Sequence, residues 1–358
     1  MSSPLLSHPG AVAVESGAVA AHYGDPLREQ RLLAEGAGLV DRSDRDVLAI
    51  PGADRLSWLH SLTSQHLERL ADGTGTEALV LSPHGHVEHH LVLADLDGTT
   101  WADVEPGTGA ELLAFLDKMR FLLRVEPALV TDEWALLSLV GPTAGEVATG
   151  AGLPVPDGVA AVDGGGWVRR MAPTAFDILV PRADVAAVAD RLLAAGAGLA
   201  GFDAYEALRV EARRPRFGVD TDHRTIPNEL SWLQTAVHLD KGCYRGQETV
   251  ARVHNLGRPP RRLVLLHLDG VSEELPTAGT PVLAGPREIG RVGTVVRHYD
   301  LGVVALALVK RSLPADAVLT VAGSAAVVDP GDVVDEADDT RDAARERVRA
   351  VRSATIGR

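Results

Sequence analysis

The chain has 358 residues, of which 46% are hydrophobic, 23% charged and only 4% aromatic, so we expect a globular protein of two or three domains with an aliphatic core. The 35 Lys and Arg and 49 Asp and Glu give a formal charge of −14, which argues against strong binding to nucleic acid or to an anionic membrane. The single cysteine excludes a disulfide within the chain. Because the N-terminus lacks a signal-peptide pattern and no stretch reaches about 18 uncharged apolar residues, we expect a cytoplasmic protein without a membrane span.

Predicted strands and helices alternate over the first two thirds of the chain. A loose leader, residues 1–35, ends in a helix-like run near "DPLREQRLLAEGAG". The elements that follow are a strand at 47–52, a helix over 53–70, a strand–turn–strand hairpin over 76–96, a helix over 107–127, strands at 134–142 and 176–181, and a helix over 182–198. No G-x-G-x-x-G or G-K-[ST] phosphate loop is present. The order therefore predicts an α+β fold of antiparallel sheets with helices on one face.

The pattern of predicted elements changes after about residue 260. Five or six short strands without helices follow one another, which indicates a small β-barrel over 259–328 with a boundary at "PPRRL". The region 36–258 then holds two α+β subdomains, divided near 130–175. The charged tail, 329–358, has little to bury and is predicted to be disordered.

The lone cysteine lies in an unusual polar octet, "KGCYRGQE". Its two glycines predict a shaped loop between a helix and a strand. The neighbouring lysine and arginine would favour a thiolate, which makes a candidate reactive thiol; an inert cysteine in a tight turn stays open as the alternative. The octet consists of Lys241, Gly242, Cys243, Tyr244, Arg245, Gly246, Gln247 and Glu248.

This octet resembles the signature of the YgfZ family of folate-binding proteins, which are relatives of the glycine-cleavage T-protein, an aminomethyltransferase. The block "VDRSDRDVLAIPGADRLSWLHSLTSQHLERL" is similar to the opening of that family. The stretch from "GRPPRRLVLLHLDG" to "GVVALALVKRSL" is similar to its C-terminal barrel, and the likeness runs from about residue 36 to 325. The resemblance implies a GcvT-like cloverleaf: two α+β subdomains and a small barrel around a central folate-sized hole.

The resemblance also implies a pterin site with tetrahydrofolate or a derivative as cofactor. "AFDIL" is similar to the "G-F-E-I" strand of T-proteins, so Asp177 stands where those proteins have a pterin-binding glutamate. "RVEA" is similar to their "R-L-E-A", which gives Arg209 and Glu211. An ion pair between these two residues on a helix surface remains the alternative explanation.

One departure from the T-protein pattern concerns the hairpin. T-proteins carry "G-G-x-x-D-D" there, whereas this chain has "GHVEHH", so His89 and His90 replace the aspartate pair. A neutral imidazole would not stabilise a cationic folate as a carboxylate does, which argues against T-protein-type aminomethyl transfer. A metal site is a further possibility, because on an unbroken strand one face would carry His84, His86, Glu88 and His90. A turn at "SPHGH" would break that alternation, and we expect no metal.

These observations lead to three functional hypotheses. The first is a tetrahydrofolate-binding accessory protein that supports iron–sulfur cluster assembly or repair, and iron–sulfur enzymes such as those of tRNA thiomethylation, through Cys243. The second is a folate-dependent aminomethyltransferase or demethylase, and the third a folate-binding scaffold with an inert cysteine. For the first we expect a monomer whose partners are iron–sulfur client proteins or assembly factors.

Overall fold

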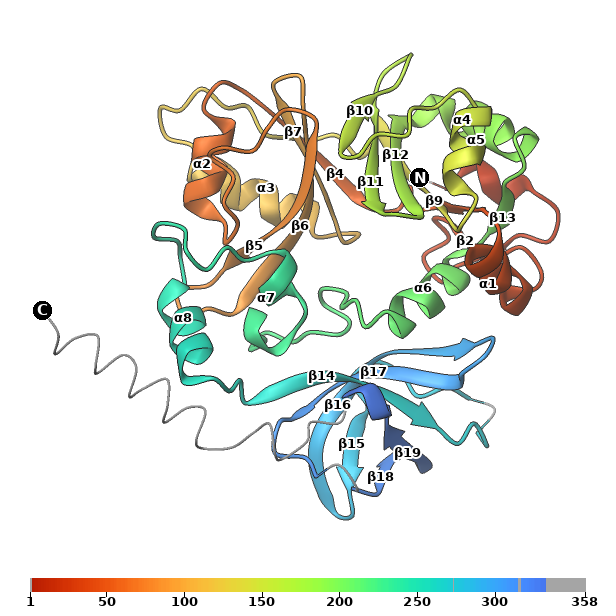
Figure 1. The fold of residues 1–358 in the computed structure, drawn as a ribbon, viewed down its shortest axis with the longest axis vertical. Coiled ribbons are helices and arrows are strands. Elements are labelled where there is room, and N and C mark those ends of the chain that lie inside the picture. Colours follow the sequence, from red (N-terminus) through yellow and green to blue (C-terminus); the bar gives the residue numbers. More distant parts are fainter. Residues whose placement is uncertain (1, 273, 315–316, 333–358) are drawn as a thin grey trace, which may run out of the picture.

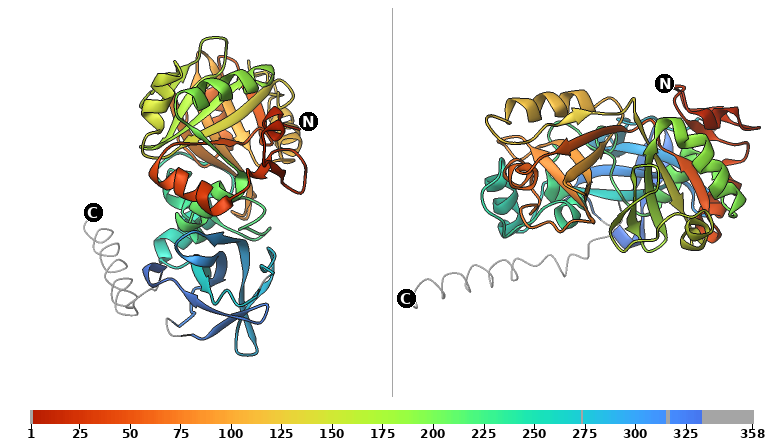
Figure 2. Two further views of the ribbon diagram at one scale, coloured as in Figure 1. Left: turned by 90° about the vertical axis from the view of Figure 1, so that its right-hand side faces the viewer. Right: turned by 90° about the horizontal axis from the view of Figure 1, so that it is seen from above.

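The computed structural model describes residues 2–272, 274–314 and 317–332. Two open sheets lie side by side, and a closed six-stranded barrel lies beneath them (Figure 1). Figure 2 shows the same two tiers from the side. The predicted α+β fold with a C-terminal barrel is confirmed. Most of the predicted disordered tail lies outside the described residues.

The N-terminal segment is ordered, in contrast to the loose leader that the sequence suggested. It forms η1 (Pro4–Ser7), β1 (Val12–Ala13), β2 (Ala20–His22) and α1 (Pro26–Glu35). The Asp25 side chain caps α1 by accepting the Arg28 amide proton. Gln30, on α1, is buried and bonds the Arg297 carbonyl and the Tyr299 amide of the barrel. This segment therefore ties the upper tier to the barrel.

The first sheet has five strands in the order β5-β6-β7-β4-β8 and is antiparallel throughout. Its strands are β4 (Asp46–Pro51), β5 (Thr74–Leu81), β6 (Val87–Leu96), β7 (Thr99–Val104) and β8 (Ala128–Leu129). Helices α2 (Arg55–Leu62) and α3 (Gly109–Lys118) share a buried apolar cluster with this sheet. The predicted hairpin at 76–96 corresponds to β5 and β6.

Both helices of this layer are shorter than the sequence predicted. α2 ends at Leu62 because the Lys241 ammonium donates hydrogen bonds to the carbonyls of His60 and Thr63. In a longer helix these carbonyls would accept backbone N–H groups of the following turn. After α3, the Trp58 indole donates to the Met119 carbonyl at 3.0 Å, and Phe121 adopts a positive φ of 50°. A residue in the left-handed conformation cannot continue an α-helix. The apolar spacing beyond residue 118 therefore predicted a helix that does not form.

The second sheet has six strands in the order β10-β11-β12-β9-β3-β13, and only the β13–β3 pair is parallel. Its strands are β3 (Gly38–Asp41), β9 (Trp134–Val140), β10 (Val159–Ala161), β11 (Trp167–Ala172), β12 (Ala175–Pro181) and β13 (Gly198–Ala200). Helices α4 (Ala144–Gly150) and α5 (Val185–Ala194), the latter preceded by η2 (Arg182–Asp184), pack on it around a second core. Because β3 precedes the first sheet in sequence, the two sheets are interleaved along the chain.

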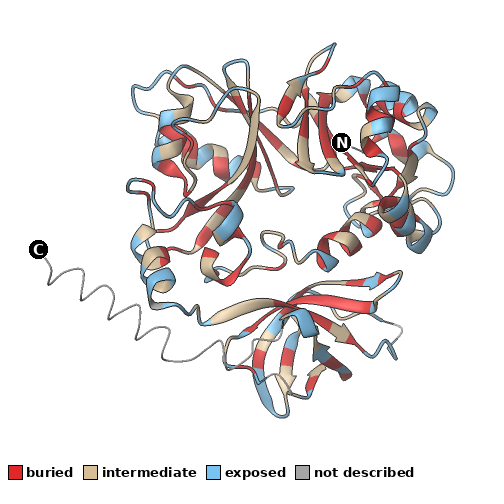
Figure 3. Cartoon of the chain, viewed as in Figure 1, coloured by how far each residue is buried: buried red, intermediate tan, exposed pale blue. Residues whose placement is uncertain are grey.

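The remaining helices connect the sheets to the barrel. They are α6 (Phe202–Glu211), η3 (Pro227–Glu229), α7 (Trp232–Thr235) and α8 (Gln247–Leu256). The barrel strands are β14 (Arg261–Leu268), β15 (Pro281–Ala284), β16 (Arg287–His298), β17 (Gly302–Lys310), β18 (Leu319–Val321) and β19 (Ser324–Val328), followed by η4 (Pro330–Asp332). Figure 3 shows buried residues concentrated on the sheets and on β17. In the part of the chain that the structure describes, no helix is long and apolar enough to cross a membrane.

Candidate functional site

A cavity of about 320 Å³ lies between the two sheets, α6, α7 and the loop after α6. We call it the central cavity. A smaller cavity of about 80 Å³ shares Tyr205, Arg209 and Arg214 with it, and a third, of about 200 Å³, shares Glu77 and Thr235. Because segments far apart in sequence supply the walls, the cavity depends on the tertiary fold.

Ten charged side chains of alternating sign form a continuous network around this cavity, which we call the charge ladder. In order along the network they are Arg42, Asp177, Arg169, Asp103, Arg45, Glu105, Arg216, Glu206, Arg209 and Asp220. Most links are short, between 2.7 and 2.8 Å, and the longest is 3.5 Å. Buried charges need partners of opposite sign, and each member here has at least one.

The ladder lowers the pKa of two of its carboxylates, Glu105 and Asp103. Burial by itself would raise the pKa of Glu105, but the guanidinium groups of Arg45 and Arg216 outweigh it and lower the pKa to about 2. The pKa of Asp103 is also held well below its usual range: burial opposes this, and Arg169 and Arg45 cause it. Both groups are therefore anions at neutral pH and depend on the arginines to remain buried.

Asp177 lies on β12, is 3% exposed and lines the smallest of the three cavities. Its carboxylate accepts hydrogen bonds from Arg169 at 2.7 Å and Ser138 at 2.6 Å, and Arg42 is 3.5 Å away. Contact between Asp177 and a pterin remains a prediction, but most of its acceptor capacity is already used.

Arg209 lies on α6 and lines both the central and the smallest cavity. It donates to Glu206 through two nitrogens, to Asp220 and the Arg214 carbonyl through Nη1, and to Thr294 of β16. All five N–H groups of a guanidinium are thus engaged. A direct bond from Arg209 to a cofactor would have to replace one of these, so its present role is to tie α6 to the barrel.

Glu211 lies outside all three of these cavities and is exposed. Its carboxylate lies 3.3 Å from His298 Nε2, and Arg209 pairs with Glu206, so the alternative Arg209–Glu211 ion pair does not form. The expected role of Glu211 in cofactor binding is not supported by this position. Residues two apart on a helix do not face each other, and the pairing with Glu206, three residues earlier, follows the helix geometry.

The two histidines that replace the aspartate pair point into different environments. His90 lines the central cavity, its Nε2 lies 3.3 Å from the Glu77 carboxylate, which can only accept a hydrogen bond, and its ring stacks on Trp232 with ring centroids 4.4 Å apart. His89 is buried on the other face of β6, where burial lowers its pKa and its Nδ1 has no partner among the described residues. Only His90 is therefore placed to meet a ligand in the central cavity.

Three charged groups at the cavities lie outside the charge ladder and retain unpaired atoms, and sequence inspection missed all three; within the ladder, Arg169 at the third cavity keeps two buried nitrogens without a partner among the described residues. Glu77 Oε1 has no hydrogen-bond donor among the described residues, since both of its contacts use Oε2. Asp44 Oδ1 is buried without a partner in the same part of the chain, and burial raises the pKa of Asp44. The exposed Arg214 makes no side-chain hydrogen bond or ion pair within residues 2–272, 274–314 and 317–332. Glu77 could have been found because it lies on the first strand of the predicted hairpin, which pairs with the strand that carries His90. Arg214 could have been found from the run "EARRPR" after a predicted helix.

The octet forms the loop before α8 and its first turn, and Cys243 is exposed. Gly246 has a positive φ of 81°, and a Cβ there would lie 2.5 Å from the Ser82 carbonyl oxygen and 2.8 Å from Gly85 of the "SPHGH" turn. This glycine is required by both its conformation and its close backbone contact. A Cβ at Gly242 would meet no atom within 4 Å, and Gly242 has no positive φ, so only one of the two glycines shapes the loop.

The two cations of the octet are engaged away from the thiol. Lys241 is buried and its ammonium donates to the carbonyls of His60, Thr63 and Gln65, while burial lowers the pKa of Lys241 to about 8. Arg245 pairs with Glu88 at 3.0 Å on the surface. The expectation that both cations stabilise a Cys243 thiolate is therefore not supported by their contacts. Tyr244 is buried, which raises its pKa to about 12.

The histidines of the hairpin do not form a common site. His84, His86 and Glu88 line a separate open cavity of about 660 Å³ with Arg245, whereas His90 lines the central one. The turn at Ser82–His86 interrupts the strand, as the sequence indicated.

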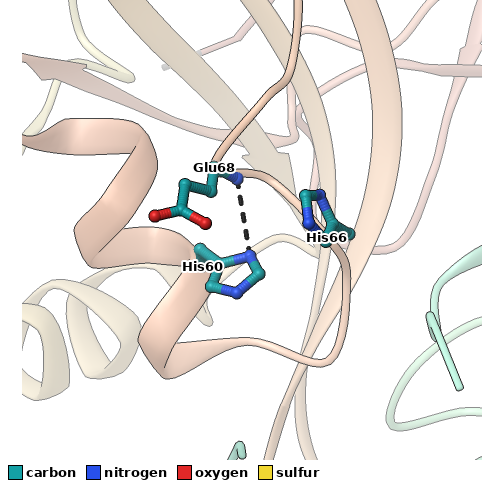
Figure 4. Close-up of side chains that lie close together, drawn as sticks. All are labelled: His60, His66 and Glu68. Atoms are coloured by element: carbon teal, nitrogen blue, oxygen red, sulfur yellow. Dashed lines mark hydrogen bonds between the residues drawn. The ribbon is translucent and has the colours of Figure 1, made fainter. Parts of the chain in front are cut away.

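A different histidine cluster lies beside the octet, formed by His60, His66 and Glu68, whose potential ligand atoms lie within 4.8 Å of one another (Figure 4). The amide groups of Leu67 and Glu68 point at His60 Nδ1, at 3.2 and 3.4 Å, and occupy its lone pair. The nearby Lys241 ammonium adds to burial in lowering the pKa of His60. Both features oppose a bound cation, and we assign no metal here.

Comparison with known proteins places this architecture in a family. Residues 18–152 match the GCVT N-terminal domain, and residues 261–336 match the CAF17 C-terminal beta-barrel domain. An aminomethyltransferase of Rubrobacter xylanophilus is 30% identical over 298 residues, which cover 78% of this chain and 77% of that protein. The chain belongs to the GCVT superfamily.

Other members of the GCVT superfamily agree with this assignment. A putative chloroplastic transferase of Arabidopsis thaliana is 25% identical over 75% of this chain and 65% of its own length, so part of that protein has no counterpart here. The crystal structure of the glycine cleavage system aminomethyltransferase T from Bartonella henselae has a similar fold, with a TM-score of 0.78 and 21% identity over 90% of this chain and 94% of that chain. The GcvT-like fold is thereby confirmed.

Replacing Gly246 by Ala should lower the free energy of unfolding by at least about 1–2 kcal/mol, because alanine disfavours the left-handed conformation and its methyl group would collide with Ser82 and Gly85. Gly242→Ala is the matched control within the octet and should change stability by less than about 0.5 kcal/mol. Urea unfolding of both variants measures the difference. Equal stabilities would show that Gly246 does not shape the loop.

Glu105→Gln should lower the free energy of unfolding at pH 7 by about 3–5 kcal/mol, because Arg45 and Arg216 would remain buried without their anion. The folded pKa of Glu105, about 2, lies below its ordinary value of 4.5, so its contribution is present above pH 4.5 and is lost as the pH falls toward 2. The difference in the free energy of unfolding between wild type and variant should therefore decrease as the pH falls from 4.5 toward 2. Glu88→Gln, which breaks the half-exposed pair with Arg245, should cost only about 0–1 kcal/mol.

Proposed function

We propose that this protein binds tetrahydrofolate or a derivative in the central cavity, and that it acts as an accessory protein in iron–sulfur cluster assembly or repair within the YgfZ group of the superfamily. The observation that carries the folate proposal is the set of charged groups at the cavity that the charge ladder leaves open. Glu77 offers an acceptor and Arg214 a cation, and Trp232 and Tyr205 are aromatic side chains of the cavity wall.

A reduced folate has the matching chemistry. Its pterin ring carries N–H donors that a carboxylate such as Glu77 accepts, and its flat ring system suits a wall with aromatic side chains. Its glutamate tail carries carboxylates that the unpaired guanidinium of Arg214 would hold. The residues present therefore fit a folate, and they would position its ring against the first sheet and its tail toward the exposed Arg214.

The iron–sulfur role rests on Cys243 and on the octet that resembles the YgfZ signature. An exposed thiol on a shaped loop is accessible to a client protein. One thiolate cannot hold a cluster alone, because clusters commonly have four protein ligands, so a role in transfer or repair fits better than storage. The absence of other cysteines is consistent with the cytoplasmic location that we propose.

A folate-dependent aminomethyltransferase is the second candidate, and the named relatives favour it. Against it, the hairpin places His90 at the cavity where T-proteins carry an aspartate. Glu77 supplies a carboxylate next to His90, so the electrostatic argument against this chemistry is weaker than the sequence alone suggested. Formation of methylene-tetrahydrofolate from an aminomethyl-lipoyl donor at metabolic rates would select this candidate.

Arg214→Ala should weaken binding of 5-formyltetrahydrofolate about tenfold, because the tail carboxylates lose their cation. Isothermal titration calorimetry measures the effect, and Arg252→Ala, on the exposed part of α8, is the control and should bind as wild type does. Failure of the wild type to bind any reduced folate would contradict the proposed function. Unchanged affinity in Arg214→Ala would contradict the placement of the tail.

Cys243→Ser should leave folding and folate affinity unchanged, since the thiol is exposed and lies outside the residues that line the central cavity. It should abolish support of iron–sulfur enzymes, including tRNA thiomethylation, in cells that depend on this protein. The readout is the activity of those enzymes in a deletion strain carrying either form. Full support by the serine variant would show that the cysteine is inert.

A further inference from the structure

The carboxylates around the central cavity differ in how much acceptor capacity they have left. Glu105 accepts from Arg45 through one oxygen and from Arg216 through the other. Glu206 is held through both oxygens by Arg209, and Arg216 adds a third contact at 3.3 Å. These carboxylates are already neutralised by guanidinium groups within the protein.

Glu77 is held differently. Its Oε2 accepts from the Thr235 hydroxyl at 2.8 Å and contacts His90 Nε2 at 3.3 Å, while Oε1 has no donor among the described residues. Its side chain is 22% exposed and lines both the central cavity and the third one. No guanidinium of the described chain contacts it, although Arg214 acts on it from a distance. Glu77 is therefore an anion with one oxygen open to the cavity.

The charge of Glu77 is stable at neutral pH. Burial raises its pKa, but hydrogen bonds from His90 and Thr235 outweigh this and lower it to about 2. Asp44, the other cavity carboxylate with an unpaired oxygen, differs from Glu77 in the direction of its pKa shift and in its charged neighbours. Burial raises its pKa, and Arg42, Arg45 and Arg216 surround it electrostatically, so it is the weaker acceptor for an additional donor.

The surroundings of Glu77 suit a flat heterocycle. His90 and Trp232 form a stacked pair at the cavity wall, with ring planes inclined by 23°. Val92 and Met171 line the same two cavities and supply apolar contacts. A ring that lies against this wall would be close to Glu77, whose free Oε1 can accept N–H groups from the edge of the ring.

We propose that Glu77 is the residue that recognises the 2-amino pyrimidine edge of the bound folate, accepting the N–H groups of the pterin in place of Asp177. This inference rests on the proposed function and adds to it the position and specificity of the ring. His90 and Thr235 act as positioning residues, which hold Oε2 so that Oε1 stays directed at the ligand. The 2-amino pyrimidine edge is the part of the pterin that presents adjacent N–H donors, so the assignment also gives the orientation of the ring.

The test compares 5-formyltetrahydrofolate with its 2-desamino-2-methyl analogue, which lacks the amino N–H groups, by calorimetry on the full chain. Wild type should prefer the 2-amino compound by about 10- to 100-fold, as expected for a hydrogen bond to a charged group. Glu77→Gln, nearly isosteric, should lose most of that preference while binding the analogue as wild type does. Glu88→Gln, a glutamate on the same hairpin that lines a different cavity, is the control and should keep the full preference.

Each outcome bears on a separate claim. Equal binding of both compounds by wild type overturns the inference without any variant, and so does a Glu77→Gln protein that keeps the wild-type preference. Loss of the preference in Asp44→Asn or Asp177→Asn, but not in Glu77→Gln, would assign the edge to that residue instead. Melting temperatures of the variants separate loss of binding from loss of folding. Wild type that binds neither compound would refute the proposed function itself.

Discussion

The charge ladder is the constraint on which the rest of the structure depends. Its members come from β7 and the residue after it, from β11 and β12, from the segment between β3 and β4, and from α6 and the loop after it. Asp220 also accepts a hydrogen bond from the Thr294 amide of β16 at 2.7 Å. Removing one member leaves an uncompensated buried charge, which costs about 3–5 kcal/mol, a large part of the stability of a typical domain. The two sheets, α6 and the barrel, whose arrangement Figure 1 shows, are therefore fixed relative to one another.

The same ladder determines what the cavity can bind. Most of its charges are paired within the protein, so an ionic ligand gains little from them. Outside the ladder, the groups that remain available are few and of different kinds: one oxygen of Glu77, one oxygen of Asp44 and the guanidinium of Arg214, beside the aromatic side chains of α6 and α7. Such a set favours a ligand with a donor-rich flat ring at one end and an anion at the other. Resemblance alone pointed to Asp177 and Arg209, the positions that the ladder has already occupied.

Much of the fold could be predicted from the sequence, because it depends on local patterns. The hairpin of β5 and β6, the strand β12 and the change to a barrel near Arg261 all follow from alternation and turn residues. The ends of α2 and α3 could not, since Lys241 and Trp58 act on them from other elements. The charge ladder could not be predicted either, because Arg45 and Asp103 are 58 residues apart and only the sheet brings them together. In the octet, the conformational role of Gly246 was predictable, whereas the burial of Lys241 was not.

A crystal structure of the protein with 5-formyltetrahydrofolate is the most direct test of the proposed folate site. We predict the ligand in the central cavity, with its pterin edge on Glu77, its tail near Arg214, and Arg209 still bonded to Glu206 and Asp220 as it is without ligand. A ligand bound outside the cavity would contradict the proposed site. A ligand inside it that is held by Arg209 and Asp177, with the ladder opened to release them, would contradict the claim that recognition falls to groups outside the ladder.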